Sequence, residues 1–470
     1  MRIKGVSLVL GLWLGLGAAH AATLKIAPDR MAVANGERTF ILGLYEYPKT
    51  PETLQQAAEA GFNLINVSDE RGLDALSAAG IWGWMNTGMN LDLSESTAER
   101  TAALGKMVGT AGKHSALLVW EVPDEALWNC WYGAQQWRWG EEPKQLRALI
   151  DALTDKALAE SLNADLAQSR TLRSNGEWAA AEQLADGIWQ KLGKTSPMPG
   201  YGLSNAAERA AKMCGGMEAG YARLRALDPE HPVWMNHAPR NQIAQLAAFD
   251  RAADIVGCDI YPVPFAPEVG HSDLAERTAA AVGAYTDRMQ EAAPGKPVWM
   301  VLQGFGWGDI QPEKSEAERK KLRRPTLEES RFMAYDAIVH GARGLLYWGT
   351  AYIEKDSTLW ADLLTLAREL KGLQPVLSAE DAQLPVSAGF EPTLGSVDRG
   401  IRVLPKSVGG KVWFIVVNEF TDALQCRLTG LASLEGAQYA DTQTGRQCAV
   451  AGGLLRLPIR GQSVQVLRPE

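Results

Sequence analysis

The sequence has few of the residues that build disulfide frameworks and metal centres. It contains 5 Cys and 6 His among 470 residues, and the His residues form neither an HxH nor an HExxH pair. We therefore expect no metal ion and no other cofactor. Because an exported chain can form disulfides, two pairings deserve consideration: Cys426 with Cys448 and Cys130 with Cys214, leaving Cys258 as a buried thiol.

Long basic runs and long apolar runs are also missing. The net charge is −8, and the main basic cluster is the short ERKKLRR at 318–324, so we expect no nucleic-acid partner. Beyond the N-terminal segment, no stretch approaches the roughly 18 apolar residues of a membrane-spanning helix, which favours a soluble mature chain. No GxSxG motif occurs, which argues against a hydrolase with a Ser nucleophile.

The first 22 residues have the pattern of a secretory signal peptide. MRIKG is basic, VSLVLGLWLGLG is apolar, and AAHAA offers small residues for cleavage after Ala21 or Ala22. The alternative, a membrane anchor, is disfavoured because the apolar run is short. Residues 1–22 therefore predict export to the periplasm or the outside, with no membrane anchor after cleavage.

Residues 23–375 alternate short apolar runs with helical patterns such as PETLQQAAEAG. Most of the runs are continuously apolar, as expected for parallel strands buried on both faces. Eight such βα units predict a (β/α)8 TIM barrel, with a doubly wound open sheet as the structural alternative. The predicted strands lie within 39–47, 62–68, 81–87, 116–122, 232–237, 253–261, 297–303 and 344–349.

Two further regions depart from this rhythm. About 110 residues separate the fourth predicted strand from the fifth, and residues 141–192 are rich in Ala, Leu, Glu, Lys and Gln. We expect a helical insertion at about 129–215, serving as a lid or cleft wall or as an inert decoration. Residues 376–470 hold short strand-like runs with Gly-rich turns and predict a β-sandwich. It either binds carbohydrate or, as the default, packs structurally on the barrel.

Polar side chains gather where the predicted strands end, and in a TIM barrel these ends form the active-site mouth. Carboxylates, amides and aromatic rings without a phosphate loop suit a hydroxyl-bearing substrate, because aromatic faces stack on sugar rings. Trp is the commonest aromatic residue, with 16 against 11 Tyr and 9 Phe. The strand-end residues are Glu46, Asp69, Asn86, Asp124, Glu125, Asn236, His237, Asp259, Tyr261, Gln303 and Trp348.

The order of motifs resembles the large retaining clan of TIM-barrel glycoside hydrolases and a branch of its secreted relatives. The resemblance spans most of 39–350 and implies an oligo- or polysaccharide substrate. By this match, Asp124 takes the place of the clan's Asn, and Glu125 that of its general acid/base. Four segments carry it: KHSALLVWEVPDEAL at 113–127, LDPEHPVWMNHAPR at 227–240, ADIVGCDIYPVP at 253–264, and KPVWMVLQGFGWGD with RRPTLEESRFMAYDAIVHGARGLLYWG across 296–349.

The chemistry of the residues agrees with that role for Glu125. A glycosidic oxygen must be protonated as it leaves, so the acid needs a raised pKa, which the neighbouring Asp124 would supply by repulsion between like charges. The alternative is a structural Glu125 in a salt bridge. Glu121 lies earlier in the strand, and we expect it between barrel layers or paired with an Arg.

The sequence departs from the clan at the seventh strand, where Gln303 stands in place of a Glu nucleophile. An amide cannot form a glycosyl ester. Three readings remain: another carboxylate acts as a base through water, another carboxylate acts as the nucleophile, or the barrel binds glycans without cleaving them. Asp259 is the leading second carboxylate, followed by Asp309 and Glu46. We expect substrate contacts from Glu46, Asp124, Asn236, Tyr261, Gln303 and Trp348.

Overall fold

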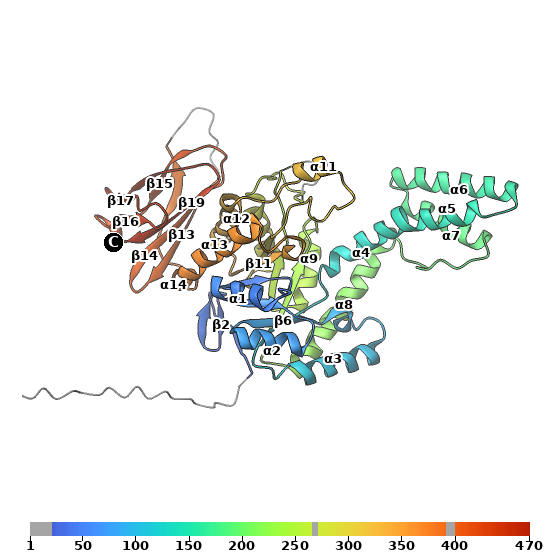
Figure 1. The fold of residues 1–470 in the computed structure, drawn as a ribbon, viewed down its shortest axis with the longest axis horizontal. Coiled ribbons are helices and arrows are strands. Elements are labelled where there is room, and N and C mark those ends of the chain that lie inside the picture. Colours follow the sequence, from blue (N-terminus) through green and yellow to red (C-terminus); the bar gives the residue numbers. More distant parts are fainter. Residues whose placement is uncertain (1–20, 266–270, 392–399) are drawn as a thin grey trace, which may run out of the picture.

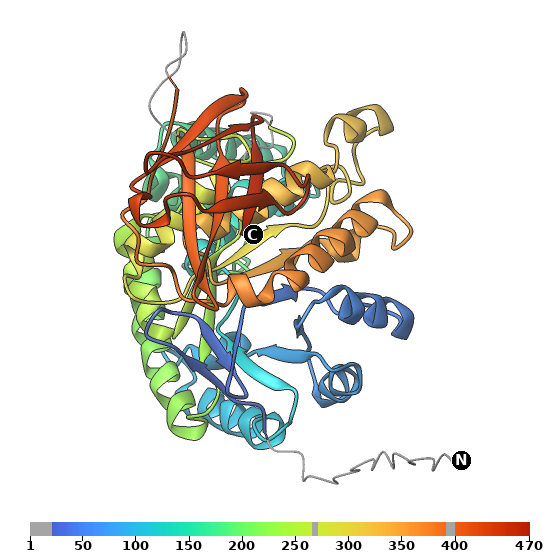
Figure 2. The same ribbon diagram turned by 90° about the vertical axis from the view of Figure 1, so that its left-hand side faces the viewer.

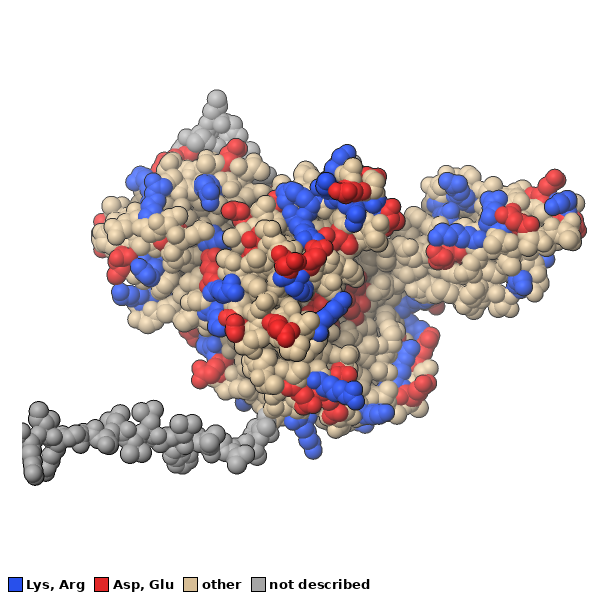
Figure 3. Space-filling model, viewed as in Figure 1, with Lys and Arg blue, Asp and Glu red and all other residues tan. Residues whose placement is uncertain are grey.

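A computed structural model describes residues 21–265, 271–391 and 400–470 (Figure 1). Residues 1–20 of the predicted signal peptide therefore lie outside the described residues. Within the described part, no helix is both long and apolar enough to cross a membrane. On the face drawn in Figure 3, Lys and Arg side chains alternate with Asp and Glu, and neither sign gathers into an extended patch.

Eight parallel strands form the barrel, in the order β10-β11-β4-β5-β6-β7-β8-β9. Backbone bridges Val256–Val298 and Asp259–Val301 join β9 to β10 and close the ring. The TIM-barrel prediction is confirmed, and the open-sheet alternative is wrong. The strands are β4 (Ile41–Leu44), β5 (Leu64–Asn66), β6 (Trp82–Asn86), β7 (Leu117–Glu121), β8 (Val233–His237), β9 (Ile255–Cys258), β10 (Trp299–Gln303) and β11 (Gly344–Trp348).

Closure at β9 depends on a residue without a side chain. A Cβ atom built on Gly257 would stand 1.9 Å from the carbonyl oxygen of Trp299 on β10. Because no side chain fits in that gap, Gly257 is required for the close approach of the two strands.

Helices connect the strands around the outside of the barrel. The α1 helix begins where the Thr50 hydroxyl accepts the backbone N–H of Thr53 at 3.2 Å, and it ends at Gly61 in the left-handed conformation. The outer helices are α1 (Pro51–Ala60), α2 (Glu70–Ala79), α3 (Thr97–Ala111), α9 (Ile243–Phe249), α10 (Ala281–Ala292), α11 (Glu316–Lys321), α12 (Leu327–Val339), α13 (Thr358–Gly372) and α14 (Gln374–Leu377).

Helices fill the chain between β7 and β8. The first and last of these helices stay close to the barrel, and the last packs against α3. The three between them project as an arm with its own apolar core, which includes Trp137, Leu162 and Trp189 (Figure 1). These elements are α4 (Ala126–Gln135), a π-helical turn (Gln136–Glu141), α5 (Glu142–Asp151), α6 (Lys156–Ser174), α7 (Trp178–Lys191) and α8 (Ala206–Leu227).

The C-terminal region is a β-sandwich, as predicted. A three-stranded sheet, β12-β15-β18, faces a five-stranded sheet, β13-β14-β19-β16-β17. Strands β16 and β17 were not predicted from the sequence. Nor was a small N-terminal sheet of β1 (Leu24–Ile26), β2 (Ala32–Ala34) and β3 (Glu37–Thr39). The sandwich strands are β12 (Ser387–Phe390), β13 (Ile401–Val408), β14 (Lys411–Asn418), β15 (Leu424–Thr429), β16 (Gln438–Asp441), β17 (Gln447–Ala449), β18 (Leu455–Ile459) and β19 (Ser463–Pro469).

The five-stranded sheet packs directly on the barrel helices (Figure 2). Along β14 the side chains alternate between two cores. Phe414 and Val416 pack inside the sandwich, whereas Ile415 and Val417 belong to the core of the barrel. A strand whose neighbouring side chains point to opposite faces thus joins the two units.

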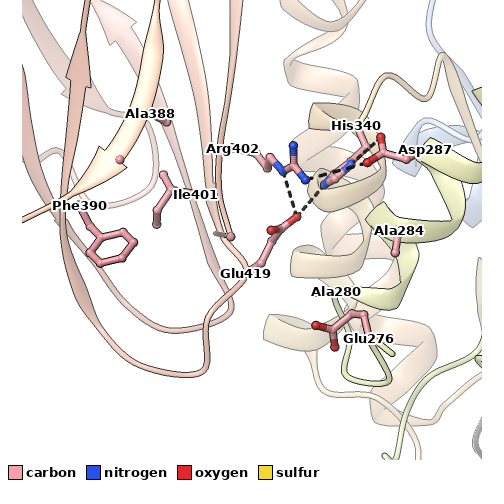
Figure 4. Close-up of a pocket in the computed structure, with 12 residues that line it drawn as sticks. Glu276, Ala280, Ala284, Asp287, His340, Ala388, Phe390, Ile401, Arg402 and Glu419 are labelled. Atoms are coloured by element: carbon pink, nitrogen blue, oxygen red, sulfur yellow. Dashed lines mark hydrogen bonds and ion pairs between the residues drawn. The ribbon is translucent and has the colours of Figure 1, made fainter. Parts of the chain in front are cut away.

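A polar cluster crosses the same interface (Figure 4). His340, which ends α12, places Nδ1 2.9 Å from Asp287 Oδ1 and Nε2 2.6 Å from Glu419 Oε1. Arg402 of β13 adds a second cation, with its Nε 3.4 Å from Glu419 Oε1. Charged groups of the barrel and the sandwich are thereby paired across the contact.

The two disulfide pairings proposed above are wrong, because all five thiols are free. Cys130 of α4 meets Met213 of α8, with 3.7 Å between the sulfur atoms. The next residue, Cys214, points about 100° further round that helix. Cys426 and Cys448 belong to different sheets of the sandwich, on β15 and β17. Cys258 is a buried thiol, as expected.

Candidate active site

A cavity of about 590 Å³ lies at the carboxyl ends of the barrel strands. Carboxyl groups and an amide line its floor, and aromatic rings line its walls. The lining residues are Tyr45, Asp124, Glu125, Trp128, Tyr132, Asn236, Ala238, Pro239, Arg240, Asp259, Tyr261, His271, Trp307, Ile310, Gln311 and Trp348.

Glu125 occupies an unusual backbone position. It is the residue before the first turn of α4, and its φ of 49° lies in the left-handed region. Residues other than glycine rarely adopt this conformation, and such strain concentrates at functional sites. The sharp change of direction from β7 into α4 presents the Glu125 carboxyl group to the cavity.

The carboxyl groups of Glu125 and Asp259 share a hydrogen bond. Burial, together with the charge of Asp124, raises the pKa of Glu125 to about 7, and the hydrogen bond from Asp259 partly opposes that rise. Burial and the two neighbouring carboxylates raise the pKa of Asp259 well above its usual range. Asp259 therefore holds its proton more tightly than an ordinary carboxyl group does.

Asp124 is the acidic residue most open to the cavity, and its orientation is fixed from behind. Its Oδ1 accepts hydrogen bonds from Asn236 Nδ2 at 3.0 Å and from the Tyr45 hydroxyl at 3.3 Å. Burial raises the pKa of Asp124 above its usual range, and these two donors partly oppose that rise. The Oδ1 atom of Asn236 is buried without a hydrogen-bond partner among the described residues.

Glu121 lies beneath Asp124, inside the barrel. Its carboxyl oxygens accept from the Tyr45 hydroxyl at 2.9 Å, from Trp84 Nε1 at 3.0 Å and from Asn86 Nδ2 at 3.0 Å. Burial, with the charge of Asp124, raises its pKa to about 8. The Arg partner considered from the sequence is replaced by these three donors, and Glu121 supports Tyr45 instead of lining the cavity.

His271 was missed in the sequence analysis. Its Nδ1 accepts the backbone N–H of Tyr261 at 3.0 Å, so the ring proton sits on Nε2, which lies 3.8 Å from Asp259 Oδ2. Burial, reinforced by the charge of Arg240, lowers its pKa to about 3, which keeps the ring neutral. No strand or helix pattern marks His271, because it lies in the irregular chain between β9 and α10.

Aromatic rings form two walls of the cavity. Tyr261 stacks between His271 and Trp348, with ring centroids 4.8 Å and 5.4 Å away. Trp128 and Tyr132 of α4 stack on each other at 5.5 Å. The base of the helical insertion therefore supplies a cleft wall, whereas none of the lining residues comes from α5, α6 or α7.

Two expected substrate contacts lie elsewhere. Gln303 is fully buried, its amide nitrogen donates to the carbonyls of Val263 and Phe305, and its oxygen accepts from Val263 N at 2.9 Å. Glu46 accepts from Gly349 N at 2.6 Å and from the Thr350 hydroxyl at 2.8 Å. Both side chains are occupied by backbone turns and do not line the cavity, so these two expectations are corrected.

The other expected residues, Asp124, Glu125, Asn236, Asp259, Tyr261 and Trp348, all line one cavity. His237 is turned away from it, since its Nε2 lies 2.9 Å from Asp250 Oδ1 in the core. Among the described residues, donors spaced for a metal ion occur at Asp336, His340 and Glu419, within 4.8 Å of one another. That group belongs to the domain interface, outside this cavity.

No protein-family model and no curated protein matches the sequence. Solved structures share its fold. A family 5 glycoside hydrolase from Bacteroides vulgatus aligns with a TM-score of 0.53 and 12% identity, over 95% of this chain and 92% of that one. A β-galactosidase from Bacillus circulans sp. alkalophilus aligns with a TM-score of 0.51 and 11% identity, over 92% of this chain and 99% of that one. For a β-galactosidase from Marinomonas ef1, the values are 0.43 and 14%, and the match covers 71% of this chain and 60% of that chain.

At these identities the comparisons establish the fold. The chain is a TIM barrel followed by a β-sandwich, an arrangement that it shares over nearly its whole length with the Bacteroides and Bacillus structures. The chemistry of the cavity has to be argued from its own residues.

Proposed function

We propose that the protein is an exported glycoside hydrolase in which Glu125 is the general acid/base. The observation that carries the proposal is the position of Glu125, held in a left-handed backbone conformation inside an acidic and aromatic cavity. A pKa near 7 suits an acid that must protonate a leaving oxygen and then accept a proton from water. The names of the structures with the same fold support this reaction class.

The aromatic walls and the cavity volume fit a sugar ring. Tyr261, Trp307 and Trp348 offer faces and edges for stacking on a sugar ring. We propose an oligo- or polysaccharide substrate on this basis. Export is supported by the N-terminal sequence pattern of residues 1–22.

A second candidate function is glycan binding without cleavage. It is favoured by Gln303, which stands where the resemblance implies a nucleophile and is fully engaged with the backbone. The two candidate functions differ in whether Glu125 transfers a proton during cleavage of a glycosidic bond.

Glu125→Gln tests the proposal, assayed by release of reducing sugars from a panel of bacterial and plant polysaccharides. We expect the substitution to lower the rate by about 10²- to 10⁴-fold, the usual contribution of a general acid/base. Glu160→Gln, on the exposed surface of α6, is the matched control and should leave the rate unchanged. Glycan binding by the wild-type protein, with no turnover across the panel, would replace the proposal by the binding function.

A further inference from the structure

Two of the acidic residues that line the cavity, Glu125 and Asp259, do not form the usual pair of a glycosidase. Retaining enzymes hold two carboxyl groups about 5–5.5 Å apart and inverting enzymes about 6.5–9.5 Å apart, so that the sugar carbon, or the carbon and a water, fits between them. Glu125 and Asp259 are instead joined by a hydrogen bond. A sugar carbon does not fit between two carboxyl groups that share a hydrogen bond, and Asp259 is only 3% exposed. Gln303 and Glu46 are held away from the cavity.

Asp124 differs from Asp259 in how it is held. Its Oδ1 is fixed by Asn236 and Tyr45, and its neighbour in the chain is the proposed acid Glu125. Asp124 is therefore an oriented hydrogen-bond acceptor beside a proton donor. This arrangement suits a substrate in which one group supplies both the nucleophile and an N–H. The N–H of that group would donate a hydrogen bond to Asp124.

We infer that the cavity takes a sugar with an acetamido group on C2 in a 1,2-trans linkage, and that Asp124 holds the acetamido N–H while Glu125 serves as acid/base. The inference rests on the proposed function and deepens it by naming the substrate class. Asp259, which donates to Glu125, becomes a positioning residue. Its own position is supported by His271, whose Nε2 lies 3.8 Å from Asp259 Oδ2.

The reaction balances without an enzyme nucleophile. The acetamido carbonyl oxygen forms a bond to C1 as the bond from C1 to the leaving oxygen breaks, and Glu125 gives its proton to that oxygen. A water oxygen then attacks C1 while the bond to the acetamido oxygen breaks, and the proton of that water returns to Glu125. Two displacements at C1 retain its configuration. Asp124 accepts the amide N–H throughout and stabilises the positive charge that develops on the acetamido group.

Nitrophenyl β-glycosides of N-acetylglucosamine and N-acetylgalactosamine, beside those of glucose and galactose, test the inference. We expect kcat/KM for one of the acetamido sugars to exceed that of its matched neutral sugar by about 10²-fold or more, since an intramolecular nucleophile is already in place. The thiazoline analogues of the two acetamido sugars mimic the cyclic intermediate and should inhibit competitively.

Asp124→Asn should lower kcat for the acetamido sugar by about 10²-fold with little change in KM, because the carboxylate acts on developing charge. Wild-type inhibition by the thiazoline keeps the test decisive even if this variant folds poorly. Cleavage of neutral glycosides without thiazoline inhibition, or trapping of a fluorinated neutral sugar on Asp259 detected by mass spectrometry, would overturn the inference and leave the proposed function standing. Failure of every glycoside and polysaccharide would remove the proposed function itself.

Discussion

His271 in the barrel cavity and His340 at the domain interface both lie beside carboxyl groups, yet they hold opposite charge states. The pKa of His271 is lowered to about 3, and that of His340 is raised to about 9. Burial lowers the pKa of both rings, so burial alone does not separate them. The difference lies in which atoms meet the two ring nitrogens.

His340 meets carboxylates at both nitrogens, Asp287 at Nδ1 and Glu419 at Nε2. His271 meets a backbone N–H at Nδ1, which requires a bare nitrogen, and its Nε2 faces Asp259, whose pKa is raised well above its usual range. Around His271 the carboxyl groups, and not the imidazole, have raised pKa values, as the proposed acid/base role of Glu125 requires. The interface keeps its proton on an imidazole, where it holds two domains together.

Replacing each histidine in turn should have the largest effect and tests the difference in charge state directly. His340→Gln removes the cation that faces the buried Asp336 and leaves Glu419 paired with Arg402. We expect it to lower the free energy of unfolding by about 3 kcal/mol. His271→Gln removes a neutral hydrogen bond and should cost about 1 kcal/mol. Urea denaturation of the two variants beside the wild type gives both values, and equal losses would contradict the assigned charge states.

The second prediction concerns the pH dependence of stability. Because the pKa of His340 is about 9 in the folded protein against 6.5 for the free side chain, its contribution is complete below pH 6.5. It is lost as the pH rises through 9. The difference of pKa corresponds to about 3 kcal/mol at most. The ring faces Asp287, Asp336 and Glu419, and Arg402 pairs with Glu419 beside it.

Denaturation curves between pH 6 and pH 10 measure this loss, and His340→Gln should flatten the profile in that window. If the free energy of unfolding of the wild type did not change with pH, or changed equally in the variant, His340 would not be the group that loses the proton.

The smallest expected effect is the pH dependence of catalysis through Glu125 in the cavity. With its pKa near 7, Glu125 should lose its proton above neutral pH, so kcat/KM should fall about tenfold for each further pH unit. Asp124→Asn removes a charge that raises this pKa, and the descending limb of the residual activity should move to lower pH. The full pH profile of both proteins checks this, and a limb that stays in place would separate Asp124 from the acid.

The barrel could be predicted because strands buried on both faces leave continuous apolar runs, such as LLVW before Glu121. The small strands β1 to β3 and β17 leave no such signal, since each has three residues. The long helical stretch after β7 was visible in composition, but which part would wall the cavity was not, because that depends on how α4 leaves the strand.

Site residues were harder to predict, because the direction of a side chain at a strand end is set by its last neighbours. Tyr45 and Glu46 follow β4 side by side, and alternation sends Tyr45 into the cavity and Glu46 to the turn after β11. That alternation was readable in the sequence, and it would have favoured Tyr45 over Glu46. The contacts of Gln303 with Val263 and the approach of His271 to Asp259 depend on loops that no local pattern describes.

The alternation of side chains along β14 determines whether the barrel and the sandwich can be separated. Because Ile415 and Val417 complete the core of the barrel while Phe414 and Val416 complete that of the sandwich, this strand is a shared wall. Cutting the chain near residue 376 would expose an apolar surface on the barrel. It would also expose the matching apolar face of the excised sandwich. The sandwich is thus a permanent part of the protein, and a barrel shortened at this point would be prone to aggregate.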